Sequence, residues 1–148
     1  LRHAGQWDLL RLSRINKGRA LRLIPLDERH HLGLMFTREK GAGAYVVNRH
    51  AATRMIEAFV PMNLPFDIMF DREWLFGYRT LVVYPFPVSQ KGYPTQIQYD
   101  IRDQYLPHWR RYWTVFPFRT AWEIGRILSR AARLPALLAY RIFRSRRT

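Results

Sequence analysis

Two carboxylates, Asp67 and Asp71, are the side chains of this sequence best placed for acid–base chemistry. They are four residues apart, so in a helix they share one face. Asp67 follows Pro65 at the expected start of that helix, where a carboxylate accepts backbone N–H groups two or three residues ahead and the helix dipole keeps it ionised. Such a carboxylate suits a base that accepts a proton from a sugar hydroxyl. Helix capping alone also explains Asp67, and Asp71 can instead pair with Arg72 or Arg79 or face solvent.

Several other kinds of chemistry lose support from what the sequence lacks. It has no Cys, so disulfides, thiolate nucleophiles and Cys-based zinc sites are excluded. The five histidines show no H-x-x-x-H spacing, which argues against a zinc site. No serine lies in a nucleophile elbow and no G-x-x-x-x-G-K-[ST] loop occurs, so hydrolase and kinase interpretations have no basis. We therefore assign no metal ligand to this chain.

The elements that position the two carboxylates alternate between strands and helices. Strands are expected at 7–12, 19–24, 32–36, 44–47 and 80–84, and the strand at 44–47 is expected to be buried. Asn48 suits a helix N-cap. The residues at helical spacing after it are Ala51, Ala52, Met55, Ile56 and Phe59. A second helix is expected from Asp67 to Phe76, with Gly77 after its end, and the alternation predicts the α/β class.

Charge divides the chain into two parts. The net charge is +14, from 25 Lys and Arg against 11 Asp and Glu, and the residues from His108 onward contain ten arginines and one acid, Glu123. We therefore predict a domain over 1–106 and an Arg-rich amphipathic helical tail over 107–148. At about 100° per residue, four arginines share one face of a helix. They are Arg119, Arg126, Arg130 and Arg133, and Ile124, Ile127, Leu128 and Ala131 lie on the other side.

This basic face predicts a polyanionic partner. Nucleic acid, anionic lipid and phosphorylated glycolipid all fit, and nucleic acid is the least favoured because no recognised reading module is present. The longest apolar run near the C-terminus, residues 134–140, is too short to cross a bilayer. The four arginines are therefore predicted to hold the chain on an anionic membrane surface. A solvated basic helix that packs on the domain explains each single arginine as well.

Several short motifs in a fixed order resemble one enzyme family. They are Trp7-Asp-Leu-Leu-Arg-Leu12, Gly43-Ala-Tyr-Val-Val-Asn-Arg49 followed by Ala51-Ala52, Pro65-Phe-Asp67, the segment 74–77, and Val83-Tyr-Pro85 with Val88-Ser-Gln90. With them, residues 7 to about 97 resemble the C-terminal half of the glycosyltransferase family 25 domain, found in lipooligosaccharide-biosynthesis galactosyltransferases. The resemblance implies a partial GT-A-like (Rossmann-like) α/β fold.

The resemblance also implies a substrate, a cofactor and a place of action. It implies a nucleotide-sugar donor such as UDP-galactose, a divalent cation such as Mn²⁺, and a lipid-linked oligosaccharide acceptor at the inner face of the bacterial cytoplasmic membrane. Asp67 would orient or deprotonate the acceptor hydroxyl, with Tyr45, Asp71, Ser89 and Gln90 in the substrate cleft.

The family's D-x-D motif, which holds the metal and the donor diphosphate, does not occur in this chain. The chain is therefore expected to be a fragment without the donor-binding half, with the metal ligands in that missing half. The alternative is a non-enzymatic basic module that binds a membrane surface or nucleic acid.

Overall fold

The computed structural model describes residues 3–14, 20–38, 42–89 and 110–145. A short 3₁₀ helix η1 (Ala4–Gln6) precedes a mixed sheet of five strands in the order β2-β3-β5-β1-β4. The strands are β1 (Leu9–Arg11), β2 (Ala20–Pro25), β3 (His31–Met35), β4 (Tyr45–Val47) and β5 (Thr80–Tyr84). β1 and β5 are parallel, and every other neighbouring pair in this sheet is antiparallel. All five predicted strands are present, and the α/β class is confirmed.

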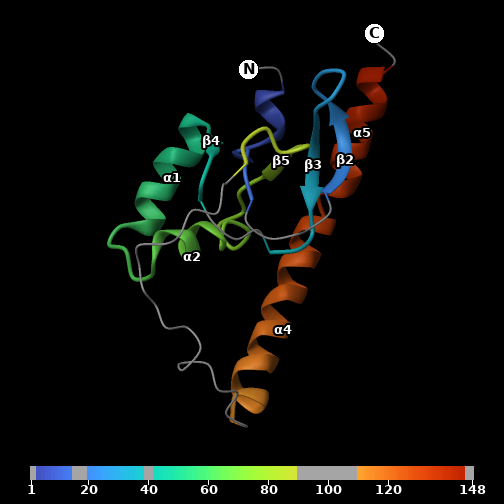
Figure 1. Ribbon diagram of the computed structural model, residues 1–148. Helices are drawn as coiled ribbons and strands as arrows, with labels where there is room; N and C mark the ends of the chain where they lie inside the picture. The colour runs from blue at the N-terminus through green and yellow to red at the C-terminus, as the bar shows by residue number, and fades with distance from the viewer. Residues whose placement is uncertain (1–2, 15–19, 39–41, 90–109, 146–148) are drawn as a thin grey trace.

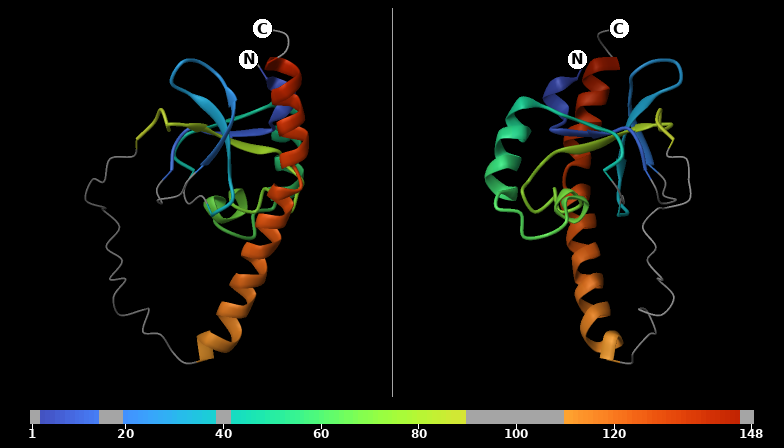
Figure 2. Two further views of the ribbon diagram at one scale, coloured as in Figure 1. Left: turned by 90° about the vertical axis from the view of Figure 1, so that its right-hand side faces the viewer. Right: turned by 60° about the vertical axis from the view of Figure 1, so that its left-hand side comes forward.

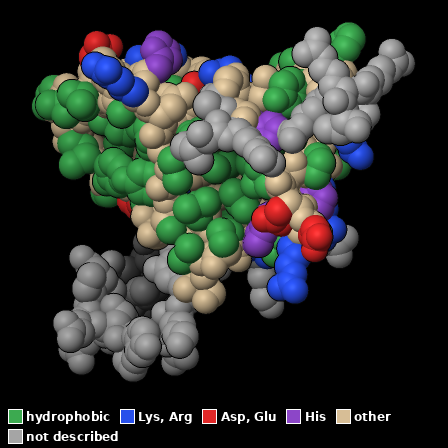
Figure 3. All heavy atoms as spheres, turned by 90° about the horizontal axis from the view of Figure 1, so that it is seen from above, with side chains coloured by type: hydrophobic (Ala, Val, Ile, Leu, Met, Phe, Trp, Pro, Cys, Tyr) green, Lys and Arg blue, Asp and Glu red, His purple; other side chains and the backbone are tan. Residues whose placement is uncertain are grey.

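Helices cover the two faces of this sheet. They are α1 (Arg49–Phe59), α2 (Phe66–Phe70), α4 (Arg110–Ala131) and α5 (Leu134–Ser145). Figure 1 shows α1 and α5 on opposite sides of the strands, with both termini at one end of the molecule. The first turns of α4 run well past the sheet in every view (Figure 2). Seen from the end that holds the termini, broad hydrophobic areas separate scattered charged side chains (Figure 3).

The core consists of two clusters, one on each face of the sheet. Leu9 and Leu10 are neighbours on β1 and point to opposite faces, as successive strand residues must. Leu10 joins a cluster that Leu137 of α5 completes, whereas Leu9 packs with residues of α1 and α2. The C-terminal helices are therefore part of the packed fold on one face, and α2 is held against the other.

Asn48 ties helix α1 to strand β1. Its Oδ1 accepts a hydrogen bond from the Ala51 N–H at 2.8 Å, so the predicted N-cap is confirmed. Its Nδ2 donates to the Trp7 carbonyl at 3.0 Å and to Asp8 Oδ1 at 3.1 Å. The helix buries Ala51 but leaves Ile56 at 66% exposure, so the two predicted apolar positions differ in role.

Asp8 also accepts hydrogen bonds from Arg79, the residue before β5. Arg79 donates to Asp8 from its backbone N–H at 2.9 Å, from Nε at 3.0 Å and from Nη2 at 2.9 Å. Burial alone would raise the pKa of Asp8, but the hydrogen bonds from Arg79 and Asn48 outweigh it and lower the pKa to about 2. The carboxylate thus fixes the start of β5 beside β1.

Two sequence expectations about this region are corrected. The strand at 44–47 is not buried, because β4 pairs only with β1 and lies at the edge of the sheet. The helix expected from Asp67 to Phe76 ends at Phe70 and continues as turns. Gly77, at φ +73°, terminates that segment in the left-handed region that favours glycine.

Candidate functional site

The arginine face of α4 packs against the domain. Arg126 and Arg130 are 1% and 2% exposed. Arg126 reaches Asp71 Oδ2 through Nη2 at 3.2 Å and Glu123 Oε2 through Nη1 at 2.6 Å. The charge on Arg126 is therefore balanced inside the fold, by one carboxylate of its own helix and one that follows α2.

Arg130 and Arg133 make the next contacts along the same face. Arg130 forms an ion pair with the buried Glu73 and donates to the carbonyls of Met35 at 2.6 Å and Thr37 at 3.1 Å. Arg133 donates to the Tyr78 carbonyl, and burial lowers the pKa of its guanidinium. These arginines satisfy acceptors that the domain would otherwise bury without donors.

The structure therefore turns Arg126, Arg130 and Arg133, which are predicted to bind a membrane or an anion, toward carboxylates and a carbonyl of their own domain. Asp71 and Glu73 lie at 4% and 0% exposure, and a buried carboxylate requires a charged partner. The helix meets that requirement by turning its arginines inward. Only Arg119, of the four predicted residues, is exposed.

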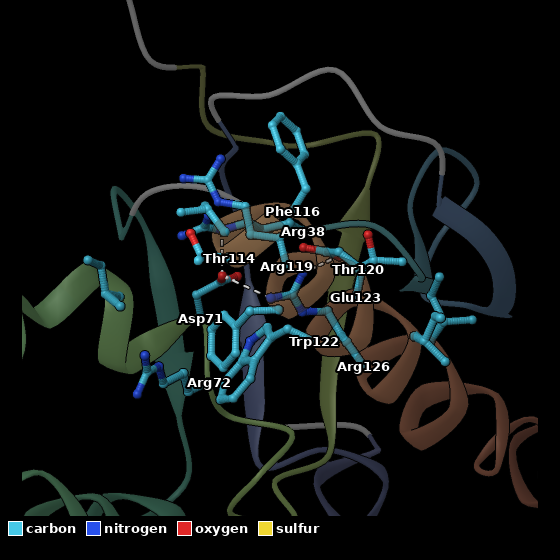
Figure 4. Close-up of a pocket in the computed structure, with 15 residues that line it drawn as sticks. Arg38, Asp71, Arg72, Thr114, Phe116, Arg119, Thr120, Trp122, Glu123 and Arg126 are labelled. Atoms are coloured by element: carbon cyan, nitrogen blue, oxygen red, sulfur yellow. Dashed lines mark hydrogen bonds and ion pairs between the residues drawn. The ribbon is translucent and has the colours of Figure 1, made fainter. Parts of the chain in front are cut away.

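A cavity of about 900 Å³ lies between α4 and the segment that follows β3 and α2. Four arginines, two carboxylates and several aromatic rings line it. The charged and aromatic lining residues are Arg38, Arg72, Arg119, Arg126, Asp71, Glu123, Phe116, Phe118 and Trp122. Figure 4 shows Asp71 facing the guanidinium groups of Arg38 and Arg126. The cavity thus combines excess positive charge with flat apolar surfaces.

Asp71 is the central acceptor of this cavity. Arg38 Nε lies 2.6 Å and Arg126 Nη2 3.2 Å from its Oδ2, while its buried Oδ1 has no hydrogen-bond partner among the residues that the structure describes. Burial raises the pKa of Asp71, and the two arginines oppose that effect. The expected alternatives of pairing with Arg72 or Arg79, or of facing solvent, are wrong.

Asp67 lies one turn before Asp71, in the first turn of α2, and is exposed. The N-cap of this helix is Pro65, so Asp67 does not cap it as expected; its Oδ1 accepts from the adjacent Ile68 N–H at 2.9 Å. Ile68 and Asp71 line the cavity, whereas Asp67 does not. The predicted base is therefore next to the cavity wall and open to an incoming molecule.

Tyr45 lies beside the same helix as part of an aromatic patch. Its ring centroid is 4.5 Å from Phe70 and 6.4 Å from Phe66, and those two rings stack at 5.4 Å. Tyr45 and Phe66 are both exposed, at 39% and 40%. Ser89 is exposed and does not line the cavity, and Gln90 lies outside the described residues. The structure thus packs Tyr45 against α2, the helix that carries Asp67, and it places Ser89 away from the cavity.

Sequence reasoning missed Arg38, Glu73 and Trp122. Arg72 lies over the Trp122 ring at 4.9 Å, which makes that tryptophan a wall of the cavity. The signal in the sequence was a third acid, Glu73, inside the helix expected from Asp67 to Phe76. A buried Glu73 requires a cation beside it, and the tail is the part of the sequence that is richest in arginine.

Comparisons with family models, with curated proteins and with solved structures find no match. Within the described residues, no group of three His, Cys, Asp or Glu side chains could hold a metal ion. No helix in the described ranges is both long and apolar enough to cross a membrane.

Proposed function

We propose that this chain is the acceptor-binding part of a GT-A-type glycosyltransferase. The substrates would be a nucleotide-sugar such as UDP-galactose and a lipid-linked oligosaccharide at the inner face of the bacterial cytoplasmic membrane. The supporting observation is that Asp67 is exposed one helical turn before Asp71, which lines a cavity with aromatic walls. The ordered motifs of residues 7–97 point to the same family.

The reaction assigns one proton transfer to this chain. The acceptor hydroxyl attacks C1 of the donor sugar, its oxygen forms the new glycosidic bond, and the bond from C1 to the phosphate oxygen breaks. The nucleoside diphosphate leaves with that electron pair, and the hydroxyl proton passes to the Asp67 carboxylate. Asp67 is suited to this role because it is exposed to an acceptor and held by the Ile68 N–H.

The described residues do not fit a site for the divalent cation that the family implies, because they contain no group of three candidate ligands. No step of this proposal therefore runs through a metal ion. Donor and cation would be bound by residues outside this chain, as the missing D-x-D motif indicates.

The surroundings of Asp67 suit a saccharide that carries anionic groups. The exposed rings of Tyr45 and Phe66 offer apolar faces for the C–H surface of a sugar. In the cavity, four arginines against two carboxylates leave a net charge of +2, which favours phosphate groups on the acceptor. The alternative of nucleic-acid binding depended on an arginine face that is mostly buried, and we do not propose it.

Acceptor binding can be measured on this chain directly. We expect saturation-transfer NMR to show contact between the chain and a phosphorylated core oligosaccharide. Tyr45→Ala and Asp67→Asn should each weaken binding about fivefold or more, since each removes a stacking surface or a charge-assisted hydrogen bond. Glu57→Gln, an equally conservative change at an exposed carboxylate of α1, should leave binding unchanged.

Two results would count against the proposal. Absence of saturation transfer to the oligosaccharide would remove acceptor binding from this chain altogether. Binding that neither variant weakens would show that the saccharide lies away from Asp67, and Asp67 would lose its assignment as the base.

A further inference from the structure

The outward side of α4 is an apolar stripe without charge. Trp113, Pro117, Thr120, Ile124, Ile127 and Ala131 follow one another at alternating spacings of four and three residues, which places them on one helix face. Leu128 lies beside them at 63% exposure, and Trp113 is 77% exposed. No residue of this series is charged. The helix therefore presents apolar side chains to its surroundings and charged ones to its own domain.

Helix α5 also exposes apolar side chains. Leu138, Ile142 and Phe143 are exposed, whereas Leu137 is buried in the core cluster with the strands. Leu137 thus fixes the rotation of α5, and the outward residues follow from it. We call seven exposed apolar residues of the two helices the outer face: Trp113, Ile124, Ile127, Leu128, Leu138, Ile142 and Phe143. Tyr112, Phe116 and Phe118 of α4 are exposed as well, and the two phenylalanines line the cavity.

The orientation of α4 is set by contacts that leave no freedom to turn this face inward. Arg126 and Arg130 are bound to Asp71 and Glu73. At Gly125 the helix lies so close to Trp74 that an added Cβ would be 3.0 Å from the indole ring. The exposure of the outer face is therefore a property of the fold and requires a covering partner, because monomers rarely leave so large an apolar area in water.

We propose that the outer face lies in the interfacial layer of an anionic membrane. Tyr112 and Trp113, two exposed aromatic side chains of the kind that favour the headgroup region, stand near the start of α4. Arg141 of α5 is exposed and can reach lipid phosphates, whereas Arg119 lies on the opposite side of α4 and lines the cavity. Glu123, the single acid after His108, is paired with Arg126. Nothing in this surface repels an anionic lipid.

Charge also separates a membrane from the other obvious cover, a second copy of the chain. Each copy carries a net charge of +14, so pairing two copies through the outer face would bring like charges together. The anionic headgroups of a bilayer attract the same charge. Contact through apolar side chains, together with attraction between a cationic protein and anionic headgroups, is typical of an interfacial amphipathic helix.

The outer face adjoins the candidate acceptor cavity. Ile124 and Ile127 belong to the outer face and also line the cavity, so the cavity opens at the edge of the surface assigned to the membrane. This connection rests on the proposed function: a lipid-linked acceptor embedded in the bilayer would reach the cavity without leaving the membrane.

Insertion can be tested with a single probe, because the chain has no Cys. An environment-sensitive fluorophore would be attached to Leu128→Cys on α4 or to Ile56→Cys on α1, two exposed aliphatic positions of similar exposure. With vesicles of phosphatidylcholine and phosphatidylglycerol, we expect a blue shift and a gain in intensity at position 128 and no change at position 56. Unchanged fluorescence at 128 would overturn the proposal. A change at 128 without lipid, together with a dimer in light scattering, would assign the face to a second copy.

Vesicle flotation of unlabelled variants provides the second measurement. The double variant Leu128→Ser with Leu138→Ser should weaken binding to the same vesicles on the order of tenfold or more, because it removes most of the apolar surface of two side chains from the contact with lipid. The matched control, Ile56→Ser with Leu75→Ser, removes as much exposed apolar surface elsewhere and should bind like the wild type. Equal loss in both pairs would overturn the proposal. These assays contain no saccharide, so their failure and a failure of oligosaccharide binding are distinguishable.

Discussion

The ion pair between Arg130 and Glu73 offers the sharpest test of the inward orientation of α4. Arg130→Met keeps an unbranched apolar stem and removes the guanidinium group. It leaves Glu73 without this partner, with Arg11 Nη2 at 3.9 Å from the carboxylate, and leaves the Met35 and Thr37 carbonyls without these donors. Breaking a buried ion pair by removing one partner costs about 3–5 kcal/mol, a large share of the stability of a domain of this size.

The assay is urea and thermal unfolding followed by circular dichroism at neutral pH. At about 2–4 °C for each kcal/mol, Arg130→Met should lower Tm by about 10 °C. Arg119→Met is the matched control, because Arg119 belongs to the same predicted arginine face but is exposed; it should change the unfolding free energy by less than about 0.5 kcal/mol.

The orientation would be refuted by equal, small effects of the two substitutions. An arginine that faced a membrane or solvent would behave like Arg119, and loss of its charge would leave the unfolding free energy nearly unchanged. A partial recovery in the double variant Glu73→Leu with Arg130→Met is expected as well, since apolar residues often replace a buried ion pair without loss. A double variant less stable than Arg130→Met alone would contradict the pairing.

Three further substitutions test other parts of the fold. The pKa of Asp8 is about 2 when folded against 3.8 for an ordinary aspartate, so its contribution is complete above about pH 5 and is lost as the pH falls toward 2; urea unfolding of Asp8→Asn should therefore show a weaker loss between pH 5 and 2 than the wild type. Gly125→Val should destabilise by about 1–3 kcal/mol through overlap with Trp74, whereas Ala121→Val, on an exposed position of the same helix, should lower Tm little. Gly77→Ala should cost about 1 kcal/mol in urea unfolding through its backbone alone, because φ is +73° and no atom lies within 4 Å of the added Cβ.

Local sequence patterns predicted the strands and the start of α1, but they did not predict how these elements are arranged in the fold. The strands follow from apolar runs between turn residues, and the cap of α1 follows from Asn48, because each depends on neighbours in the sequence. The edge position of β4 depends on which strand pairs with β1, and that is settled by packing between segments far apart in the chain. For the same reason the end of α2 at Phe70 had no clear local signal.

The candidate site shows the same limit. The spacing of Asp67 and Asp71 on one helix was evident, but their different environments were not: one is exposed and the other lies in the cavity beside Arg126, 55 residues away in the chain. Helical periodicity likewise showed that the arginines of α4 share a face, yet it could not show where that face points. The direction depended on Asp71 and Glu73, whose need for a cation becomes visible only when the fold buries them.

The inward arginines and the outward apolar face have one physical origin. An amphipathic helix on a water-soluble domain normally buries its apolar side, because that removes hydrocarbon from water. Here the domain surface offers Asp71, Glu73 and unpaired carbonyls, so the opposite side of α4 is the complementary one. Because Arg126 and Arg130 bind groups of the domain, the apolar side of the helix gains no stabilisation from contact with water. In the proposed arrangement a bilayer interface would supply the missing apolar contact, and the exposed Arg141 would add attraction to its headgroups. In this proposal fold stability and membrane contact use opposite faces of one helix, which is why Arg130→Met should destabilise the chain while the outer-face serines should only weaken its binding to vesicles.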